Sequence, residues 1–403
     1  MRARHPAWLP TLFVGMLALG TDEFVIAGIL PAVADDLRVS PGTAGQLVTA
    51  FGLAFAVGAP VLAVITDRVD RKTLLVAGLG VFALANAAVA ISDDFTITLV
   101  LRVVAGLAAA VVSPTCLAIA GTAAPEGRSG RYLAIVTAGL TVALFTGVPF
   151  GAFVGTVTSW RVTFALIAAV AVIVGVLASL MAPTVPGGTV TGLRSRLAPL
   201  RDPRVLSLVT AMFLSGAGGL AFYNYLGAIL TDRVAATANT VTVVLVVVGV
   251  VGVAAVVLGG CLSDRLAPRW ATGAVLGGHC LALGLIALHL SGTQTLGVAT
   301  FLLIGAWSLF AWGLSPVMQA AVLRAAPSQP MLAMALGISG LYGGSAVGAA
   351  VGGRLFDQHG SAAVPAVGTG FLLVAVLCAV WGTRLSPSRG GRAASYPATS
   401  SRQ

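Results

Sequence analysis

The amino-acid sequence predicts an all-α membrane protein of about twelve transmembrane helices. Hydrophobic residues make up 58% of the 403 residues and charged residues only 9%, whereas a soluble domain is typically about 45–50% apolar and about 25% charged. Long runs such as Val162–Met181 and Val241–Val257 are apolar on every face, which favours helices over the alternating strands of a β-barrel. The 50 glycines suit close packing of helices within a membrane.

Twelve apolar runs are long enough to cross a bilayer, since a spanning helix needs about 20 mostly apolar residues. The first run continues from the basic N-terminus to Val33 without a small-residue cleavage site, which favours an uncleaved span over a signal peptide. The predicted spans are 8–33, 41–65, 73–92, 96–121, 132–155, 161–182, 205–230, 239–262, 270–290, 295–322, 332–354 and 365–385.

The basic residues are distributed unevenly between the loops. Alternate loops and both ends of the chain carry most of the 23 lysine and arginine residues, whereas the other loops carry only Arg38 and Arg233, with Arg161 and Arg354 at helix edges. Basic loops stay on the cytoplasmic side, so we expect both termini in the cytoplasm and a multi-pass protein of the plasma membrane. The same distribution explains the net charge of +10 without nucleic-acid binding. The Arg-, Ala-, Val- and Gly-rich composition is typical of a GC-rich bacterial genome.

The two halves of the sequence repeat with a shift of 197 residues. At this shift Asp67-Arg68 matches Asp264-Arg265, and Gly52 matches Gly249; the ladder Gly147, Gly151 and Gly155 matches Gly344, Gly348 and Gly352. A parallel repeat of two six-helix units is a known transporter plan. We therefore expect a first bundle at 1–182, a cytoplasmic linker at 183–204, a second bundle at 205–385 and a disordered cytoplasmic tail at 386–403.

Five short segments carry a family resemblance. They are Gly20–Phe24 in the first span, Asp67–Lys72 after the second, Arg102–Gly106 in the fourth, Gly147–Gly151 in the fifth and Trp160–Phe164 after the fifth. In this order and at these spans they resemble motifs of the major facilitator superfamily, and within it of the twelve-span drug:proton antiporters. The ending of the fifth-span motif is similar to that of the chloramphenicol-resistance and sugar-efflux branches. The loop motif departs from the usual pattern at Ala63 and Asp70, where glycine is usual.

The resemblance implies the major facilitator fold, with two pseudo-symmetric six-helix bundles, and export of a small molecule in exchange for protons by alternating access. It places the acidic position of the first-span signature at Glu23, while Asp22 departs from the usual small polar residue. It assigns Arg102 to a buried arginine motif, and Gly147, Pro149, Gly151 and Gly155 to an antiporter motif. It assigns Asp67, Arg68, Arg71, Asp264 and Arg265 to a gating or bracing role at the cytoplasmic face.

Within the spans, Asp22 and Glu23 are interpreted as the only deeply placed acidic residues and Arg102 as the only deeply placed basic one. Ionisable groups there are costly and commonly mark a substrate or proton pathway. Burial disfavours a charged carboxylate and a nearby arginine favours it, so such a group can load a proton on one side and release it on the other. Adjacent residues point about 100° apart on a helix, and which of Asp22 and Glu23 carries the proton is left open. Glu23 and Arg102 could also simply hold helices together.

The fifth-span glycine ladder is typical of close helix packing, and Pro149 can bend that helix by removing a backbone hydrogen bond. Aromatic residues with few polar groups suit an amphipathic organic ligand, although aromatic residues also favour membrane interfaces. The candidate residues of the substrate cavity are Phe222, Tyr223, Asn224, Tyr225, Trp312 and Gln319, with Trp307, Asn86 and Gln46 as further candidates.

The favoured hypothesis is proton-driven export of a drug or antibiotic, such as chloramphenicol, and the alternative is export of a sugar or nucleoside-like metabolite. The glycine-rich fifth span argues against an importer by resemblance. The sequence has no H-E-x-x-H, G-x-S-x-G or P-loop pattern, so we expect neither an enzyme nor direct use of ATP. The four cysteines form no C-x-x-C pair, and we expect no metal, no cofactor and a monomer.

Overall fold

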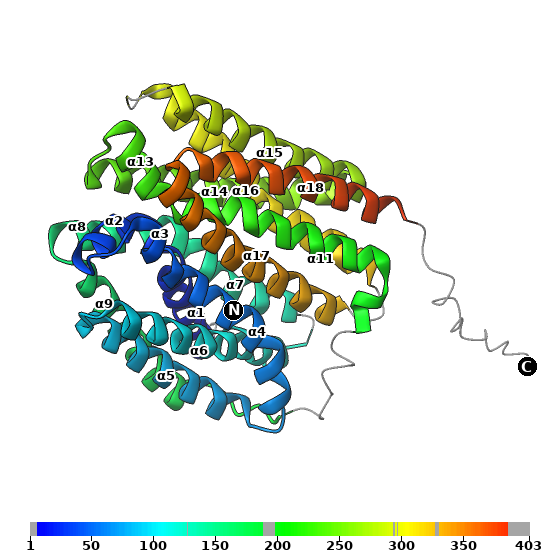
Figure 1. The fold of residues 1–403 in the computed structure, drawn as a ribbon. Coiled ribbons are helices and arrows are strands. Elements are labelled where there is room, and N and C mark those ends of the chain that lie inside the picture. The colour runs from blue at the N-terminus through cyan, green and yellow to red at the C-terminus, as the bar shows by residue number, and fades with distance from the viewer. Residues whose placement is uncertain are drawn as a thin grey trace, which may run out of the picture.

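The computed structural model describes residues 6–126, 128–187, 198–292, 295, 297–326 and 330–385 as a bundle of helices (Figure 1). Within these ranges, eleven helical segments are each long and apolar enough to cross a membrane, and the bent pair at the start of the chain makes a twelfth. The predicted all-α membrane protein with twelve spans is therefore confirmed. The predicted tail at 386–403 and most of the linker, 188–197, lie outside the described residues.

The first half supplies the first six spans, and three of these are each made of two helices. Its helices are α1 (Trp8–Phe24), α2 (Ile26–Asp36), α3 (Pro41–Ala44), α4 (Gln46–Ile65), α5 (Arg71–Ile91), α6 (Phe95–Thr122), α7 (Ser129–Phe145), α8 (Gly147–Val157) and α9 (Trp160–Met181).

The second half supplies the other six spans after a short 3-10 turn, η1 (Ala198–Arg201). The remaining elements are α11 (Pro203–Ser215), the π-helical turn η2 (Gly216–Leu220), α12 (Ala221–Asn224), α13 (Leu226–Val234), α14 (Ala238–Arg265), α15 (Pro268–Gly292), α16 (Val298–Ala325), α17 (Pro330–His359) and α18 (Ala363–Arg384).

Short polar residues begin several of the spans. The Asp94 side chain accepts the Ile97 amide at the start of α6, and Asp70 accepts the Lys72 and Thr73 amides at the start of α5. A side-chain oxygen at this position satisfies amides that have no partner within the helix. Asp70, which replaces the glycine usual in the loop motif, therefore starts a helix.

The two halves repeat the same packing. In the first half α1 packs on α7, α4 on α6 and α5 on α9; in the second half α11 packs on α17, α14 on α16 and α15 on α18. These are equivalent pairs of spans in a six-helix repeat. The predicted pair of pseudo-symmetric bundles accounts for this pattern, and Figure 1 shows the first half, in blue and cyan, beside the second.

Two helix pairs join the halves along their length, α4 with α17 and α7 with α14. The repeat-related glycines Gly52 and Gly249 lie in these two contacts: a Cβ at Gly52 would lie 3.4 Å from the Ala346 Cβ, and one at Gly249 would lie 2.6 Å from the Phe145 Cβ. Each of these two contacts between the halves therefore contains a glycine of the repeat.

One end of the bundle carries the basic loops 67–72, 128–131 and 265–269 and is called here the basic end. At the opposite end, α2 contacts α13 and α3 contacts α17, so the halves are closed against each other there. Figure 1 shows α2, α3 and α13 together at one end of the molecule.

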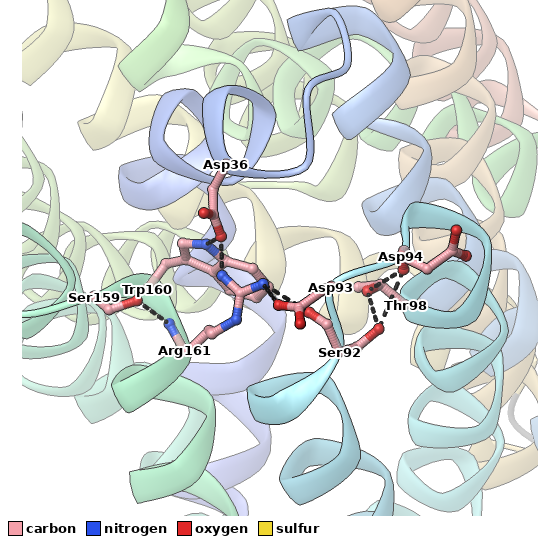
Figure 2. A network of polar contacts seen from close by, with 8 residues as sticks. All are labelled: Asp36, Ser92, Asp93, Asp94, Thr98, Ser159, Trp160 and Arg161. Atoms are coloured by element: carbon pink, nitrogen blue, oxygen red, sulfur yellow. Dashed lines mark hydrogen bonds and ion pairs between the residues drawn. The ribbon is translucent and has the colours of Figure 1, made fainter.

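A polar network ties the first half together at the opposite end (Figure 2). The Arg161 guanidinium, on the first turn of α9, forms ion pairs with Asp36 at the end of α2 and with Asp93, 2.6 Å away, between α5 and α6. The Trp160 indole donates to the same Asp36 carboxylate at 2.8 Å. All of these partners belong to the first half, so the network fixes its three loops relative to one another.

Large apolar side chains are exposed on the outside of the bundle, among them Leu84, Ile91, Leu180 and Leu288. Exposure to water of so much apolar surface would be unfavourable, whereas lipid accommodates it. Helices satisfy their own backbone hydrogen bonds and can therefore stand in lipid. The exposed apolar surface and the lengths of the spans are both consistent with a lipid bilayer.

Candidate functional site

A closed ion pair lies inside the first half. The Arg102 Nη1 atom of α6 lies 2.8 Å and 2.9 Å from the two carboxylate oxygens of Asp22 on α1, and Arg102 Nη2 lies 3.4 Å from the Asp22 carbonyl. Both side chains are 1% exposed or less. A buried pair of this kind is stable only with close geometry, and here each charge directly faces its partner.

Aromatic rings enclose the guanidinium of this pair. The Arg102 Cζ atom lies 4.5 Å from the centre of the Phe51 ring and 5.6 Å from that of Phe164. Such cation–π contacts stabilise a cation that has been removed from water. Arg102 thus has its carboxylate partner and its ring contacts within the first half, which suits a fixed role better than contact with a mobile ligand.

Glu23 points to the other half of the molecule. Its Oε2 atom accepts a 2.7 Å hydrogen bond from the Tyr342 hydroxyl of α17, and the Tyr342 ring packs on Phe55 of α4 with ring centres 4.3 Å apart. Glu23 is only partly buried, whereas its neighbour Asp22 is wholly buried. The angular offset of adjacent helical residues thus gives the two acids different surroundings, one inside a bundle and one at the interface between bundles.

Five aromatic residues, called here the aromatic group, lie at the interface beside Glu23. They are Phe24, Phe222, Tyr223, Trp307 and Trp312. The Phe24 ring meets Tyr223 at 5.8 Å and Trp312 at 5.5 Å, both edge to face. Tyr223 in turn stacks on Trp307 at 6.1 Å, and Phe222 meets Trp307 at 5.0 Å. The structure therefore brings together Phe222, Tyr223 and Trp312 of the predicted cavity residues, next to Glu23.

The other predicted cavity residues lie elsewhere. The Tyr225 hydroxyl donates to the Ala349 carbonyl at 2.9 Å and lies 3.5 Å from the Gly42 carbonyl, at the closed opposite end. Asn224 is buried and donates to the Ser345 hydroxyl at 3.3 Å, and Gln319 donates to the Ser315 hydroxyl of its own helix at 2.9 Å. None of these three contacts involves the aromatic group or Glu23.

The glycine ladder of the fifth span packs on the first span. A Cβ at Gly147 would overlap Thr21, one at Gly151 would lie 2.7 Å from Val25 Cγ2, and one at Gly155 would lie 2.9 Å from Ile29 Cγ2. Each glycine of the ladder therefore contacts the first span, which carries Asp22 and Glu23. The same span is broken at Thr146, between α7 and α8, three residues before Pro149.

The loop motif at the basic end forms a compact structure in the first half. The Arg71 guanidinium pairs with the Asp67 carboxylate at 3.1 Å, and both line a cavity of about 210 Å³ between α4, α5 and α6. The Arg71 amide donates to the Val185 carbonyl at 2.9 Å, so the start of the linker lies against the loop. Arg68 is exposed. In the second copy, Asp264 and Arg265 are exposed and form no ion pair among the described residues.

Two residues were missed by the reasoning from sequence. Tyr342 is a single hydroxyl-bearing aromatic residue within the glycine-rich run Gly340–Gly344, and that contrast could have drawn attention to it. His279 lies in the middle of α15 and is 2% exposed. Because histidine is also ionisable, Arg102 is not the only deeply placed residue with a basic side chain, contrary to the prediction.

Two repeated six-helix bundles that meet across a partly buried carboxylate have the architecture of a secondary membrane transporter. The chain belongs to the Major Facilitator Superfamily, whose family model matches residues 12–314. The predicted family is thereby confirmed, and the protein is a transporter and not an enzyme.

Similar proteins of known sequence cover nearly the whole chain. A chloramphenicol resistance protein of Streptomyces lividans is 31% identical over 376 residues, which are 92% of this chain and 95% of that protein. The uncharacterized transporter YtbD of Bacillus subtilis is 31% identical, with 96% and 98% covered. The inner membrane transport protein YdhP of Escherichia coli is 28% identical, again with 96% and 98% covered.

A solved structure shares the fold. It is a bacterial homologue of the human lysosomal transporter Spinster in an inward-facing, unoccupied conformation. The TM-score is 0.74 with 16% identity, and the match covers 94% of this chain and 98% of that one. The predicted major facilitator fold is thus confirmed.

Proposed function

We propose that this protein exports a small amphipathic organic compound, a drug or antibiotic, in exchange for protons. The observation that carries the proposal is the hydrogen bond from Tyr342 to Glu23, because it joins the two halves through a titratable group. The halves must move relative to each other in alternating access. A proton that binds to Glu23 therefore acts directly on the contact that this motion changes.

The chemistry of the carboxyl group supports this role. An ionised carboxylate only accepts hydrogen bonds, whereas a protonated one also donates. Arrival of a proton therefore alters what Glu23 offers both to Tyr342 and to a ligand at the interface. Asp22 is a poorer candidate for the proton site, because Arg102 occupies both of its carboxylate oxygens.

The aromatic group beside Glu23 supports an amphipathic substrate. Phe24, Tyr223 and Trp312 present ring surfaces from both halves next to a single carboxyl group. Ligand sites in proteins combine such apolar surfaces with a few polar groups. The similarity to a chloramphenicol resistance protein favours the same class of compound.

The direction of transport and the orientation in the membrane belong to the same proposal. The loops at the basic end carry the arginines that the positive-inside rule assigns to the cytoplasm, so both termini would lie there, in the plasma membrane of a bacterium. The chain acts as a monomer, because each of its two halves supplies groups to the one interface. The closed opposite end then faces outward and is the exit for the exported compound.

Proteoliposomes with the purified protein test this function. An inside-acid pH gradient is imposed on vesicles whose basic end faces outward, and the uptake of labelled chloramphenicol is measured. We expect gradient-dependent accumulation, abolished by Glu23→Gln and retained by Glu126→Gln, since Glu126 is an exposed glutamate in a loop at the basic end. Accumulation that persists in Glu23→Gln, or that does not depend on the pH gradient, would contradict the proposal. Arabinose and inosine in the same assay test the sugar and nucleoside classes.

A further inference from the structure

The second half contains a cluster of buried nitrogen atoms without partners. Among the described residues, eight buried side-chain nitrogen or oxygen atoms have no hydrogen-bond partner in the protein. Four of the eight belong to three residues: both ring nitrogens of His279 and the indole nitrogens of Trp307 and Trp312. Unpaired buried polar atoms are unfavourable, and each calls for a specific explanation.

These three residues form a connected group. The His279 ring of α15 lies 6.0 Å from the Trp307 ring of α16, centre to centre. Tyr223 stacks on Trp307 and meets Trp312 edge to face at 5.7 Å. Trp312 is partly buried at the interface, where it meets Phe24 of the first half, while Trp307 and His279 are 0% and 2% exposed. The unpaired nitrogens therefore extend from the interface into the second half.

The backbone at Gly219 packs directly against the His279 ring. The π-helical turn η2 passes over it, and a Cβ at Gly219 would lie 2.7 Å from the His279 Nε2 atom. Any larger residue at position 219 would displace the imidazole. Short π-helical segments are frequent at functional sites, and this one lies in the span that carries Phe222 and Tyr223.

The internal repeat shows that the fold does not need a histidine here. At the shift of 197 residues, His279 corresponds to Phe82, which is fully buried in the first half. The same shift relates Gly219 to Asp22. The first half thus places its buried charge on the first span, whereas the second half has glycine there and a polar ring on the span beside it. A phenylalanine would fill the same place without leaving two nitrogens unpaired.

We propose that Trp312, Trp307 and His279 form a subsite in the second half that binds the hydrogen-bond acceptors of a neutral aromatic substrate. This inference rests on the proposed function, because it specifies the substrate class of the same interface. Indole nitrogens only donate, and a neutral imidazole offers one donor and one acceptor. Such a set, made mostly of donors, matches the oxygen atoms of carbonyl, nitro or hydroxyl groups rather than a cation. Phe24 and Tyr223 supply ring contacts for the apolar part of the ligand.

Binding measurements with two probes test the subsite. Chloramphenicol is neutral, aromatic and rich in acceptors, whereas tetraphenylphosphonium is an aromatic cation without acceptors. The variants are Trp307→Phe, Trp312→Phe and His279→Phe, each of which keeps a ring and removes the hydrogen-bonding nitrogens. The matched control is Trp381→Phe, because Trp381 is 56% exposed on the outer surface of α18. Equilibrium binding of each radiolabelled probe is measured on purified protein in nanodiscs, with folding checked by size-exclusion chromatography.

We expect each of the three variants to weaken chloramphenicol binding about threefold to tenfold, as expected for the loss of one neutral hydrogen bond. Trp381→Phe should bind both probes as the unmodified protein does, and no variant should weaken tetraphenylphosphonium binding. Unchanged chloramphenicol binding in all three variants overturns the inference, as does binding of tetraphenylphosphonium alone or of neither probe. Failure of the proposed function is a separate result, since it appears as gradient-dependent accumulation that persists in Glu23→Gln while the three variants still weaken binding.

Discussion

The Asp357 carboxylate of α17 accepts a 2.6 Å hydrogen bond from the Ser40 hydroxyl and a 3.1 Å hydrogen bond from the Gly42 amide at the start of α3. A side chain of the second half thereby caps a helix of the first. The backbones also meet here, since a Cβ at Gly42 would overlap the Gly353 carbonyl. With the nearby Tyr225 hydroxyl, these contacts hold the opposite end closed.

Removal of this carboxylate should favour opening of that end. Asp357→Ala leaves the Ser40 hydroxyl and the Gly42 amide without their partner, and we expect the closed state to lose about 1–2 kcal/mol, a shift of roughly tenfold in its population. Spin labels at the exposed positions Arg38 and Asn239, on a background without native cysteines, report the distance between the halves. Double electron–electron resonance should show a larger population of long distances between the two labels.

Arg161→Ala is the matched control for this experiment. Its ion pairs with Asp36 and Asp93 lie at the same end of the molecule but join parts of the first half only (Figure 2). Loss of these pairs should lower stability without a change in the label distances. If Arg161→Ala widened the distances as much as Asp357→Ala, the capping contact would have no special role in closure.

Tyr342→Phe should slow proton-coupled exchange without loss of folding. The variant keeps the ring contact with Phe55 and removes only the hydroxyl that donates to Glu23. The net contribution of one such hydrogen bond is about 0.5–1.5 kcal/mol, so we expect the exchange rate to fall about threefold to tenfold. Exchange of labelled compound in proteoliposomes provides the measurement. An unchanged rate would show that Glu23 works without this link between the halves.

Sequence reasoning identified the buried charges but not their pairing. The acids and Arg102 are visible as rare ionisable residues in apolar runs, and the repeat is visible in the spacing of glycines. Helical geometry fixes the angle between Asp22 and Glu23 but not the rotation of the helix, so it left their roles open. The partner Tyr342 is more than 300 residues away in the chain, and only packing of the two halves brings it to Glu23.

Breaks in the first and seventh spans were not predicted from the sequence, whereas Pro149 did suggest a bend in the fifth. The prediction gave continuous spans at 8–33 and 205–230. The first is bent by 50° between α1 and α2, and the other contains a π-helical turn and a break at Tyr225. Pro31 also removes a backbone hydrogen bond, but it lies within α2, after the bend. The glycines of Gly216–Leu220 are compatible with several backbone paths, so the actual path depends on neighbours such as His279.

Arg102→Ala should be severely destabilising. The substitution leaves the Asp22 carboxylate buried without its partner, and breaking a buried ion pair in this way costs about 3–5 kcal/mol. The double substitution Asp22→Asn with Arg102→Gln removes both charges and should recover much of that loss. Thermal unfolding in detergent measures both, with Arg128→Ala, at an exposed loop position, as the control. A single variant as stable as the unmodified protein would contradict the requirement for a paired charge.

Gly151→Val should disturb the contact between the fifth span and the first. Even a Cβ at this position would lie 2.7 Å from Val25 Cγ2 and 3.0 Å from Thr163 Cγ2, and overpacking of this kind typically costs about 1–3 kcal/mol. Because Val25 stands at the bend beside Glu23, we expect transport to fall further than the loss of stability alone explains. Gly80→Val is the control, since a Cβ there would meet no atom within 4 Å. If both variants transported at the rate of the unmodified protein, close packing of the ladder would be unnecessary for the motion of the halves.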